Sequence, residues 1–312
     1  MIFVSIAAYC DSLLGFTIER ALATARRPDE VRFGIVDQSD GSCAKAVPRK
    51  SGYVRIDPEY ARGPCWARAI AMSLYSGEDW FLQLDSHMDF DDGWDEQLPA
   101  AAVGLVSAFP APLVLTTYPP AFVFENGAPV KRSNDQVLAM AVKRGVMFEG
   151  NHCVLSFEAY QAGALPVNGF HVGAGCLFAP GRIVTEVPYD PAIYFLGEEQ
   201  SFALRLFTNG WNIFHVRMPI YHLYTDAANG SPPRALHWER DESWRDLDLR
   251  SRRRLNALVS GALRGTYGLG KARTVDDFAR FSGIDYGRRR IAPRAYTPQG
   301  KTIIKTPRFQ VG

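Results

Sequence analysis

The sequence has 312 residues, of which 47% are hydrophobic, 22% charged and 12% aromatic. This composition excludes disordered, collagen-like and coiled-coil chains, and the length predicts one large domain, or one domain with an appendage, around a sizeable core. No apolar run approaches the roughly 18 to 20 residues of a membrane span, and residues 1–6 lack the basic region of a secretory signal. The five cysteines are widely spaced without a C-x-x-C pair, which argues against a disulfide framework and favours a reducing cytoplasm.

Charge is distributed unevenly along the chain. Residues 250–312 hold 15 Lys and Arg against 3 Asp and Glu, a net charge of +12, whereas residues 1–249 hold 20 against 30, a net charge of −10. An acidic body with a basic end indicates an anionic ligand or partner near the C-terminus. The alternative is a solvated helix face followed by a flexible basic tail, which we favour because charge runs are weak indicators of function.

Short apolar runs alternate with helical patterns through the first 120 residues. Strands are expected over residues 2–8, 31–36, 80–84 and 113–117, and helices over residues 13–25, 66–75 and 94–106. This alternation predicts a mostly parallel sheet covered by helices, in which ligands bind beyond the carboxyl ends of the strands. Asp37 and Gln38 follow the second strand, and Asp85 follows the third, so a site is expected at that edge.

The rest of the chain is less regular. Residues 119–135 are rich in Pro, Asn and Gly and are expected to form a loop. Further strands are expected over residues 154–157, 172–178, 212–216 and 220–224, and helices over residues 198–206, 239–265 and 275–281. A linker rich in Gly, Pro and Ser at residues 227–234 predicts a main domain over 1–226, a helical extension over 227–286, and an extended basic tail over 287–312.

One short segment carries a recognisable metal chemistry. The apolar strand before Asp85 delivers that carboxylate to the edge of the sheet, and His87 follows two residues later. In an extended chain residues i and i+2 point to the same side, so both side chains can face one ion. A carboxylate oxygen with an imidazole nitrogen suits a divalent ion such as manganese, which would stabilise a diphosphate leaving group. The alternative is a capping aspartate and a surface histidine.

Several segments, taken together, resemble one enzyme family. They are residues 63–68 (GPCWAR), 75–78 (YSGE) and 82–88 (LQLDSHM), with residues 4–11, 34–38, 173–179, 195–199, 221–224, 267–270, 273–274 and 283–285. In this order they resemble the cytoplasmic polypeptide (hydroxyproline) N-acetylglucosaminyltransferases and, more distantly, the mucin-type polypeptide GalNAc-transferases. The resemblance covers most of residues 1–286.

The resemblance implies a GT-A glycosyltransferase fold, with residues 1–226 as the catalytic domain and a D-x-H version of the D-x-D metal motif. The donor would be a UDP-sugar, with UDP-GlcNAc preferred. Asp85 and His87 would bind the metal, Mn²⁺ with Mg²⁺ as the alternative, and His222 would be the third protein ligand. From the residues alone, His222 reads as a histidine packed between Tyr221 and Tyr224.

The resemblance also assigns the donor site. Arg68 would contact the nucleotide, since a guanidinium can bind two oxygens of a diphosphate or ribose; a solvated helix arginine is the alternative. Uridine is expected at the end of the first strand and beside the second, near Ser5, Ala7, Tyr9, Asp11 and Asp37.

Gly173 and Gly175 would let a sugar approach the backbone, unless they form a strand bulge. Glu198 or Glu199 would bind donor-sugar hydroxyls or meet the acceptor, and otherwise they favour the helix dipole.

The resemblance implies transfer with retention by a front-face route, in which the leaving diphosphate helps to deprotonate the acceptor hydroxyl. We expect that acceptor on a polypeptide, as Ser, Thr or hydroxyproline. A hydroxymethylated base in DNA is the alternative, with the basic C-terminal region tracking phosphates. Two other classes are a catalytically silent sugar-binding module and a metal hydrolase built on Asp85, His87 and His222. The sequence carries no signal for the oligomeric state.

Overall fold

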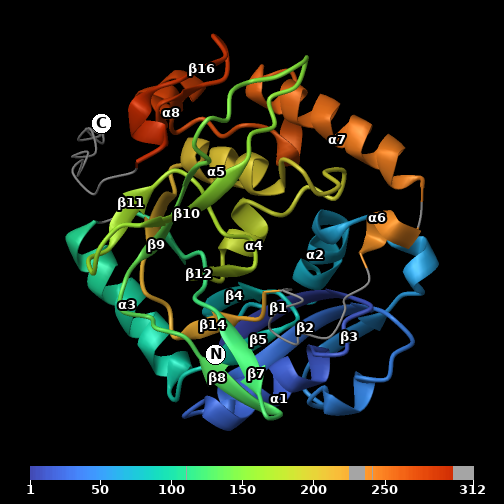
Figure 1. Cartoon of the computed structure of the whole chain (residues 1–312). Helices are drawn as coiled ribbons and strands as arrows, with labels where there is room; N and C mark the ends of the chain where they lie inside the picture. Colours follow the sequence, from blue (N-terminus) through green and yellow to red (C-terminus); the bar gives the residue numbers. More distant parts are fainter. Residues whose placement is uncertain (110, 225–235, 241, 298–312) are drawn as a thin grey trace.

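The computed structural model describes residues 1–109, 111–224, 236–240 and 242–297 (Figure 1). An eight-stranded sheet with helices on both faces forms its centre, which confirms the α/β class and the mostly parallel sheet. In spatial order the strands are β11 (Val167–Gly169), β13 (Asn212–His215), β6 (Leu113–Thr116), β12 (Cys176–Pro180), β4 (Trp80–Leu84), β1 (Ile2–Tyr9), β2 (Val31–Gln38) and β3 (Gly52–Arg55). Among the described residues, no helix has the length and apolarity to cross a membrane.

The pairing of the central strands decides where a site can form. β1 pairs in parallel with both β2 and β4, and β2 pairs in parallel with β3. β12 runs antiparallel between β4 and β6, and β11 runs antiparallel to β13 at the edge. The carboxyl ends of β1, β2 and β4 therefore meet at one edge of the sheet, where parallel sheets place their ligands.

Helices cover both faces of the sheet. They are α1 (Leu14–Thr24) and α3 (Trp94–Ala108) on one face, and α2 (Pro64–Met72), α4 (Ile183–Glu186) and α5 (Glu198–Thr208) on the other. The alternation of side chains along β1 explains this arrangement. Val4 and Ile6 are buried against α1 and α3, whereas Phe3 between them is buried with residues of α2, α4 and α5.

The expected loop over residues 119–135 contains a hairpin. β7 (Phe122–Glu125) pairs antiparallel with β8 (Ala128–Lys131), and Asn126 and Gly127 form the two-residue turn between them. Both turn residues have positive φ, 51° and 79°, which Asn and Gly adopt more easily than other residues. The Asn-Gly pair is the local signal for this hairpin, and its two strands of four residues are too short to show a clear pattern.

Two other expected strands differ in the structure. The strand expected over residues 154–157 is wrong in extent, because the structure has β10 (Phe157–Gln161), paired antiparallel with β9 (Leu138–Val142). The strand expected from residue 172 begins only at Cys176, because the segment before it turns back and the Cys176 N–H donates to the Gly173 carbonyl. Apolar runs cannot distinguish such a buried turn from a strand.

The C-terminal elements pack against the main domain. They comprise α6 (His237–Arg240), α7 (Trp244–Val259), α8 (Val275–Ser282), β15 (Ile284–Asp285) and β16 (Arg290–Ile291). Leu255 of α7 and Phe278 of α8 share a core with Leu204 and Phe207 of α5. In Figure 1, α7 and α8 lie at the end of the molecule away from α1. Short 3-10 helices occupy Pro28–Glu30, Ala44–Ala46, Pro58–Tyr60, Gly265–Tyr267 and Pro293–Ala295.

The first part of the expected basic tail is packed. Residues 287–297 include β16 and a 3-10 helix, and Ala295 is fully buried. The expectation of an extended chain is wrong for these residues, because Ala292 and Ala295 follow β16 back onto the C-terminal end of α8. The expected linker at 227–234 and residues 298–312 lie outside the described residues.

Candidate active site

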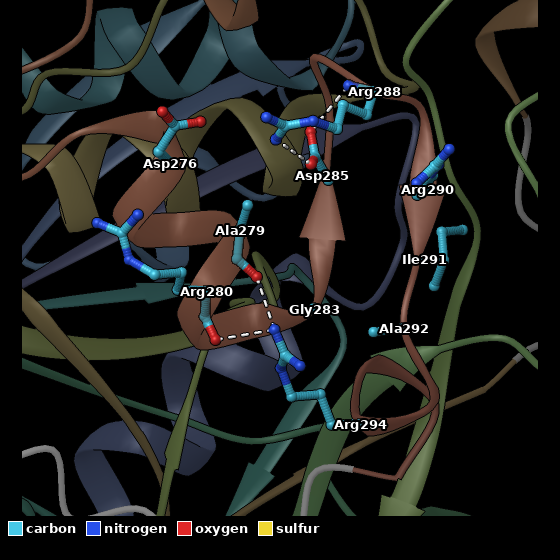
Figure 2. Close-up of a pocket in the computed structure, with 10 residues that line it drawn as sticks. All are labelled: Asp276, Ala279, Arg280, Gly283, Asp285, Arg288, Arg290, Ile291, Ala292 and Arg294. Carbon is cyan, nitrogen blue, oxygen red and sulfur yellow. Dashed lines mark hydrogen bonds and ion pairs between the residues drawn. The ribbon is translucent and has the colours of Figure 1, made fainter.

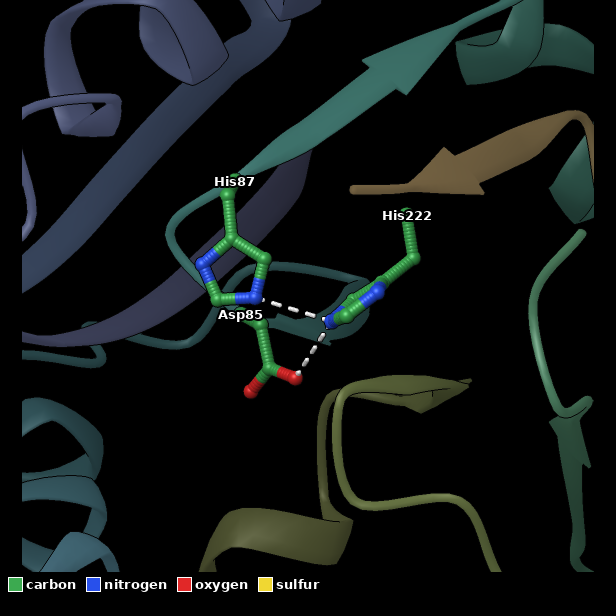
Figure 3. Close-up of side chains that lie close together, drawn as sticks. All are labelled: Asp85, His87 and His222. Atoms are coloured by element: carbon green, nitrogen blue, oxygen red, sulfur yellow. Dashed lines mark hydrogen bonds and ion pairs between the residues drawn. The ribbon is translucent and has the colours of Figure 1, made fainter. Parts of the chain in front are cut away.

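A small two-stranded sheet brings distant parts of the chain together at the carboxyl edge of the central sheet. β4 delivers Asp85 to this edge, and His87 follows two residues later. β5 (Met88–Phe90) then pairs antiparallel with β14 (Ile220–His222), so that His222 lies beside His87 although 135 residues separate them in sequence. Figure 3 shows the three side chains pointing toward one another.

The three side chains form a compact cluster of potential metal ligands. Asp85, His87 and His222 each offer one ligand atom, and these atoms all lie within 4.8 Å of one another. The Nε2 atoms of the two histidines are 2.8 Å apart, and His222 Nε2 lies 3.5 Å from Asp85 Oδ2. The cluster lies at the end of β4, where the sequence predicts a site. The pairing of β5 with β14 places His222 there.

Asp11 orients His87 from behind. Its Oδ2 atom lies 2.6 Å from His87 Nδ1 and also accepts a hydrogen bond of 2.6 Å from the Ser86 hydroxyl. Burial alone would raise the pKa of Asp11, but the hydrogen bonds from His87 and Ser86 hold the pKa below its usual value. An ionised Asp11 makes Nδ1 of His87 the donor, so the Nε2 lone pair faces the cluster.

This donor set fits a divalent cation. Two imidazole nitrogens with one carboxylate oxygen are ligands that first-row divalent metals accept. A carboxylate behind a ligating histidine is the usual support in metal sites, and Asp11 supplies it for His87. The residues present therefore fit the metal that the D-x-H motif implies.

A buried arginine links the cluster to α5. Arg68 donates to Asp85 Oδ1 at 2.8 Å and forms an ion pair with Glu198 through its other amino group. Burial alone would raise the pKa of Asp85, but the hydrogen bond from His222 and the charge of Arg68 hold the pKa far below its usual range. Burial raises the pKa of Glu198 despite the opposing charge of Arg68. Asp85 is therefore ionised, as a metal ligand must be.

Glu198 and Glu199 point to different partners from the first turn of α5. Glu198 is 5% exposed and faces Arg68. Glu199 accepts a hydrogen bond of 2.8 Å from the Ala174 N–H, and its second oxygen lies 3.4 Å from His171 Nε2. Sequence reasoning did not single out His171, because an isolated histidine in an apolar run carries no local signal.

A cavity of about 300 Å³ opens onto the metal-ligand cluster. Six of the residues singled out in the sequence line it, namely Ala7, Tyr9, Asp11, Asp85, His87 and His222. Gln38, at the end of β2, lines it as well. The volume lies at the lower end of the range typical of small-molecule sites. The edge of the sheet thus combines potential metal ligands with a binding cavity.

The other expected donor-site residues lie off this cavity in the described structure. Ser5 is fully buried within β1, and Asp37 is 1% exposed and accepts a hydrogen bond of 2.7 Å from the Tyr53 hydroxyl. Arg68 is 5% exposed and is occupied by the two carboxylates described above. Of these three side chains, only Arg68 contacts a potential metal ligand, Asp85.

The two glycines make room for protein atoms. A Cβ atom at Gly175 would lie 2.2 Å from Asp85 Oδ2, and one at Gly173 would lie 2.5 Å from the Thr117 carbonyl oxygen. Gly175 is therefore required by the position of the Asp85 carboxylate, and Gly173 by close packing against the segment that follows β6. The sequence interpretation considered only a sugar or a bulge as the reason for these glycines.

Short helix α6 supplies a wall that sequence reasoning missed. His237 and Trp238 line the cavity, and the two nitrogens of His237 lie 2.7 Å from the Tyr194 hydroxyl and 3.0 Å from the Ala61 carbonyl oxygen. The Trp238 ring packs against Phe195 with centroids 5.1 Å apart. The helical pattern was expected to begin only at residue 239, so these two residues were assigned to no site.

The fold is that of the GT-A glycosyltransferases. The family model described as "Glycosyltransferase (GlcNAc)" matches residues 44–288, and the chain belongs to this family. A comparison of the sequence with curated proteins finds no significant match.

Two solved structures are similar to this chain. The crystal structure of GalNAc-T7 with UDP, GalNAc and Mn²⁺ matches with a TM-score of 0.56 and 13% identity, over 90% of this chain and 54% of that one. The chain thus spans about half the length of GalNAc-T7. The structure of S. aureus TarS 1-349 in complex with UDP-GlcNAc matches with a TM-score of 0.43 and 14% identity, over 80% of this chain and 66% of that one.

Proposed function

We propose that this protein is a metal-dependent glycosyltransferase that moves GlcNAc from UDP-GlcNAc to a hydroxyl group with retention. The family match supports the transfer of an N-acetylhexosamine. The observation that carries the proposal is the convergence of Asp85, His87 and His222 at the mouth of the cavity. GalNAc-T7, which shares the fold, was crystallised with Mn²⁺ and UDP, and this supports manganese and a uridine nucleotide as the first ligands to test.

The proposed roles follow from the contacts of each side chain. Asp85, His87 and His222 would hold the cation, which supplies positive charge next to the departing diphosphate. Asp11 orients His87, and Arg68 keeps Asp85 ionised and in place. Each of these contacts exists before the donor binds, so the site needs little reorganisation.

The uridine and the sugar would lie on either side of the cluster. Tyr9 and Ala7 line the cavity at the end of β1, where the aromatic ring can stack on uracil. Ser5 and Asp37, which were also expected near the uridine, are buried and do not line this cavity. We assign Glu198 to hydroxyls of the donor sugar and Glu199 to the acceptor side.

Retention without a dedicated nucleophile is part of the proposal. Glu198 is paired with Arg68 and is buried, so its carboxylate is better placed to orient a hydroxyl than to attack a sugar carbon. In a front-face transfer the leaving diphosphate takes the proton of the acceptor hydroxyl. The protein then contributes orientation and electrostatic stabilisation of the leaving group.

We propose a polypeptide hydroxyl, on Ser, Thr or hydroxyproline, as the acceptor. A cytoplasmic location is part of this proposal and is supported by five free cysteines. The second candidate, a hydroxymethylated base in DNA, is favoured by the excess of arginines in residues 250–297. We further propose 1–226 as the catalytic domain and 227–286 as an extension that supports α5 and adds His237 and Trp238 to the wall of the active-site cavity.

The test is release of UDP from a panel of UDP-sugars, with and without Mn²⁺. We expect the fastest release with UDP-GlcNAc, none without a divalent metal, and none in Asp85→Ala or His87→Ala. Asp92→Ala is the matched control, because this nearby aspartate is exposed. Wild-type activity in either ligand variant, with the fold intact by circular dichroism, refutes the metal assignment.

The acceptor and the competing classes need separate measurements. Intact-mass analysis of candidate polypeptides and of DNA with hydroxymethylated bases identifies which class gains a HexNAc. Binding of UDP-GlcNAc without any release of UDP identifies a silent module. Turnover of a test phosphoester in the absence of sugar nucleotide identifies a metal hydrolase.

A further inference from the structure

A second cavity lies on the C-terminal extension and shares no lining residue with the active-site cavity. Its volume is about 490 Å³, and α8, β15, β16 and the 3-10 helix after them form its walls (Figure 2). Its charged lining residues are Arg280, Arg288, Arg290, Arg294, Asp276 and Asp285. Four arginines against two aspartates leave a net positive charge, and we call this cavity the arginine groove.

Three of these arginines are held by contacts within the protein, and one of them, Arg280, forms an ion pair of 2.5 Å with Asp277. Arg294 donates through Nη2 to the Ala279 and Arg280 carbonyl oxygens at 3.0 and 2.9 Å, which satisfies carbonyls at the end of α8. Arg288 donates to Asp285 Oδ2 at 3.0 Å, and its backbone N–H donates to Asp285 Oδ1 at 2.8 Å. The guanidinium groups of Arg288 and Arg294 keep further N–H donors for a ligand.

The three consecutive arginines at residues 288–290 have different contacts; Arg288 and Arg289 lie in the turn between β15 and β16, and Arg290 is the first residue of β16. Arg289, with a positive φ of 51°, donates to the carbonyl oxygens of Glu149, Gly150 and His152 and so fixes a neighbouring loop. Arg288 and Arg290 lie on the other side and line the groove. The Arg290 side chain is exposed, and among the described residues it has no hydrogen-bond or ion-pair partner, whereas the Arg290 backbone pairs with Asp285 of β15.

The surroundings add to the positive charge. Residues 250–297 hold 12 Lys and Arg against 3 Asp and Glu, whereas residues 1–249 carry a net charge of −10. A concave surface lined by one sign of charge concentrates ions of the opposite sign. The structural core of the extension needs none of Arg280, Arg288 and Arg290, whose side chains are exposed.

We propose that the arginine groove binds the phosphate groups of an anionic ligand. Guanidinium groups match phosphate oxygens with paired donors, and several arginines around one cavity suit a group of more than one negative charge. The volume falls within the range of small-molecule sites. The phosphates can belong to a free oligophosphate or to a nucleic-acid strand. This inference does not depend on the proposed transferase activity.

The test uses the full chain and inorganic tripolyphosphate as the probe, measured by isothermal titration calorimetry in EDTA. We expect saturable binding that weakens about tenfold or more in Arg290→Glu, since a charge-assisted hydrogen bond is lost and a repulsion is added. Arg290→Gln should give a smaller loss. Arg253→Glu, on the exposed side of α7, makes the same change in net charge outside the groove and should bind within about twofold of wild type.

A further control separates the groove from the active site. Binding should be unchanged in Asp85→Ala, which removes a ligand of the metal-ligand cluster. The proposal is overturned if tripolyphosphate does not bind, if Arg253→Glu weakens binding as much as Arg290→Glu, or if only Asp85→Ala weakens it. Equal displacement by poly-glutamate rejects phosphate as the chemical class. Displacement by a single-stranded oligonucleotide supports a nucleic-acid source, and displacement only by free oligophosphates supports a small molecule.

Discussion

Replacing Gly175 by alanine tests the geometry of the metal site with one methyl group. The added Cβ would lie 2.2 Å from Asp85 Oδ2 and 2.8 Å from its Cγ, whereas unstrained contacts need about 3.5 Å. The Asp85 carboxylate must therefore move by roughly 1 Å. Its other oxygen is held by Arg68, so the carboxylate must rotate or lose that hydrogen bond. Gly175 has no positive φ, so its backbone accepts alanine.

A displacement of about 1 Å in a positioned group costs on the order of 100-fold in rate, or about 2.7 kcal/mol of transition-state stabilisation. We expect Gly175→Ala to lower kcat/KM for UDP release by about this factor and to weaken Mn²⁺ binding at least about tenfold. Gly104→Ala is the matched control, because Gly104 is exposed on α3 and an added Cβ meets nothing within 4 Å.

Two readouts decide between the explanations for this glycine. If Gly175 makes room for Asp85, Mn²⁺ affinity and kcat fall together. If it makes room for the sugar, KM for UDP-GlcNAc rises while Mn²⁺ affinity stays at the wild-type value. A folded Gly175→Ala protein with unchanged Mn²⁺ affinity would refute the reasoning from the Asp85 contact.

Further predictions concern two other buried groups. Asp11→Asn should weaken Mn²⁺ binding about 10- to 100-fold, measured by titration calorimetry, because His87 loses the anionic partner of its Nδ1–H. His215 is buried beside His171, and burial followed by the charge of that neighbour lowers its pKa from 6.5 to about 3. Below pH 6.5, His215 becomes protonated in the unfolded chain but stays neutral in the folded protein. The free energy of unfolding therefore falls as the pH falls, by up to about 1.4 kcal/mol per pH unit. When the free energy of unfolding is measured with urea between about pH 4 and pH 7, it should depend less steeply on pH in His215→Gln than in the wild type.

Each of these predictions has a control. Asp40→Asn changes an exposed carboxylate near the same edge and should leave Mn²⁺ affinity at the wild-type value. An equal loss in Asp40→Asn would attribute the effect of Asp11→Asn to general electrostatics. His152→Gln removes a half-buried histidine whose pKa is also lowered, but less than that of His215, so it should reduce the pH dependence of stability less than His215→Gln does. A larger reduction in His152→Gln than in His215→Gln contradicts the assignment.

Local patterns were sufficient for the parallel core of the fold. The expected strands at residues 2–8, 31–36 and 80–84 correspond to β1, β2 and β4, because buried parallel strands are continuous apolar runs bounded by polar residues. The hairpin of β7 and β8 was missed, because its strands are short and partly exposed and only the Asn-Gly turn announces it.

The candidate site likewise contains residues that local sequence patterns predict and residues that they do not. The spacing of Asp85 and His87 after an apolar strand is a local property, so both residues could be singled out from the chain itself. His222 came only through the family resemblance, because its partner is 135 residues away and no local pattern specifies the pairing of β5 with β14. The contacts of Arg68 with Asp85 and Glu198 have the same non-local origin.

The amino-acid sequence by itself determined the α/β class, the edge of the sheet where a site forms, and two of the three potential metal ligands. These follow from periodicity and from residues close together in the chain. Only the tertiary structure shows that Asp11 contacts Nδ1 of His87, that the Asp85 carboxylate leaves no room for a side chain at residue 175, and that His237 lines the cavity. Such contacts join segments far apart in sequence, and they depend on how strands pair and helices pack.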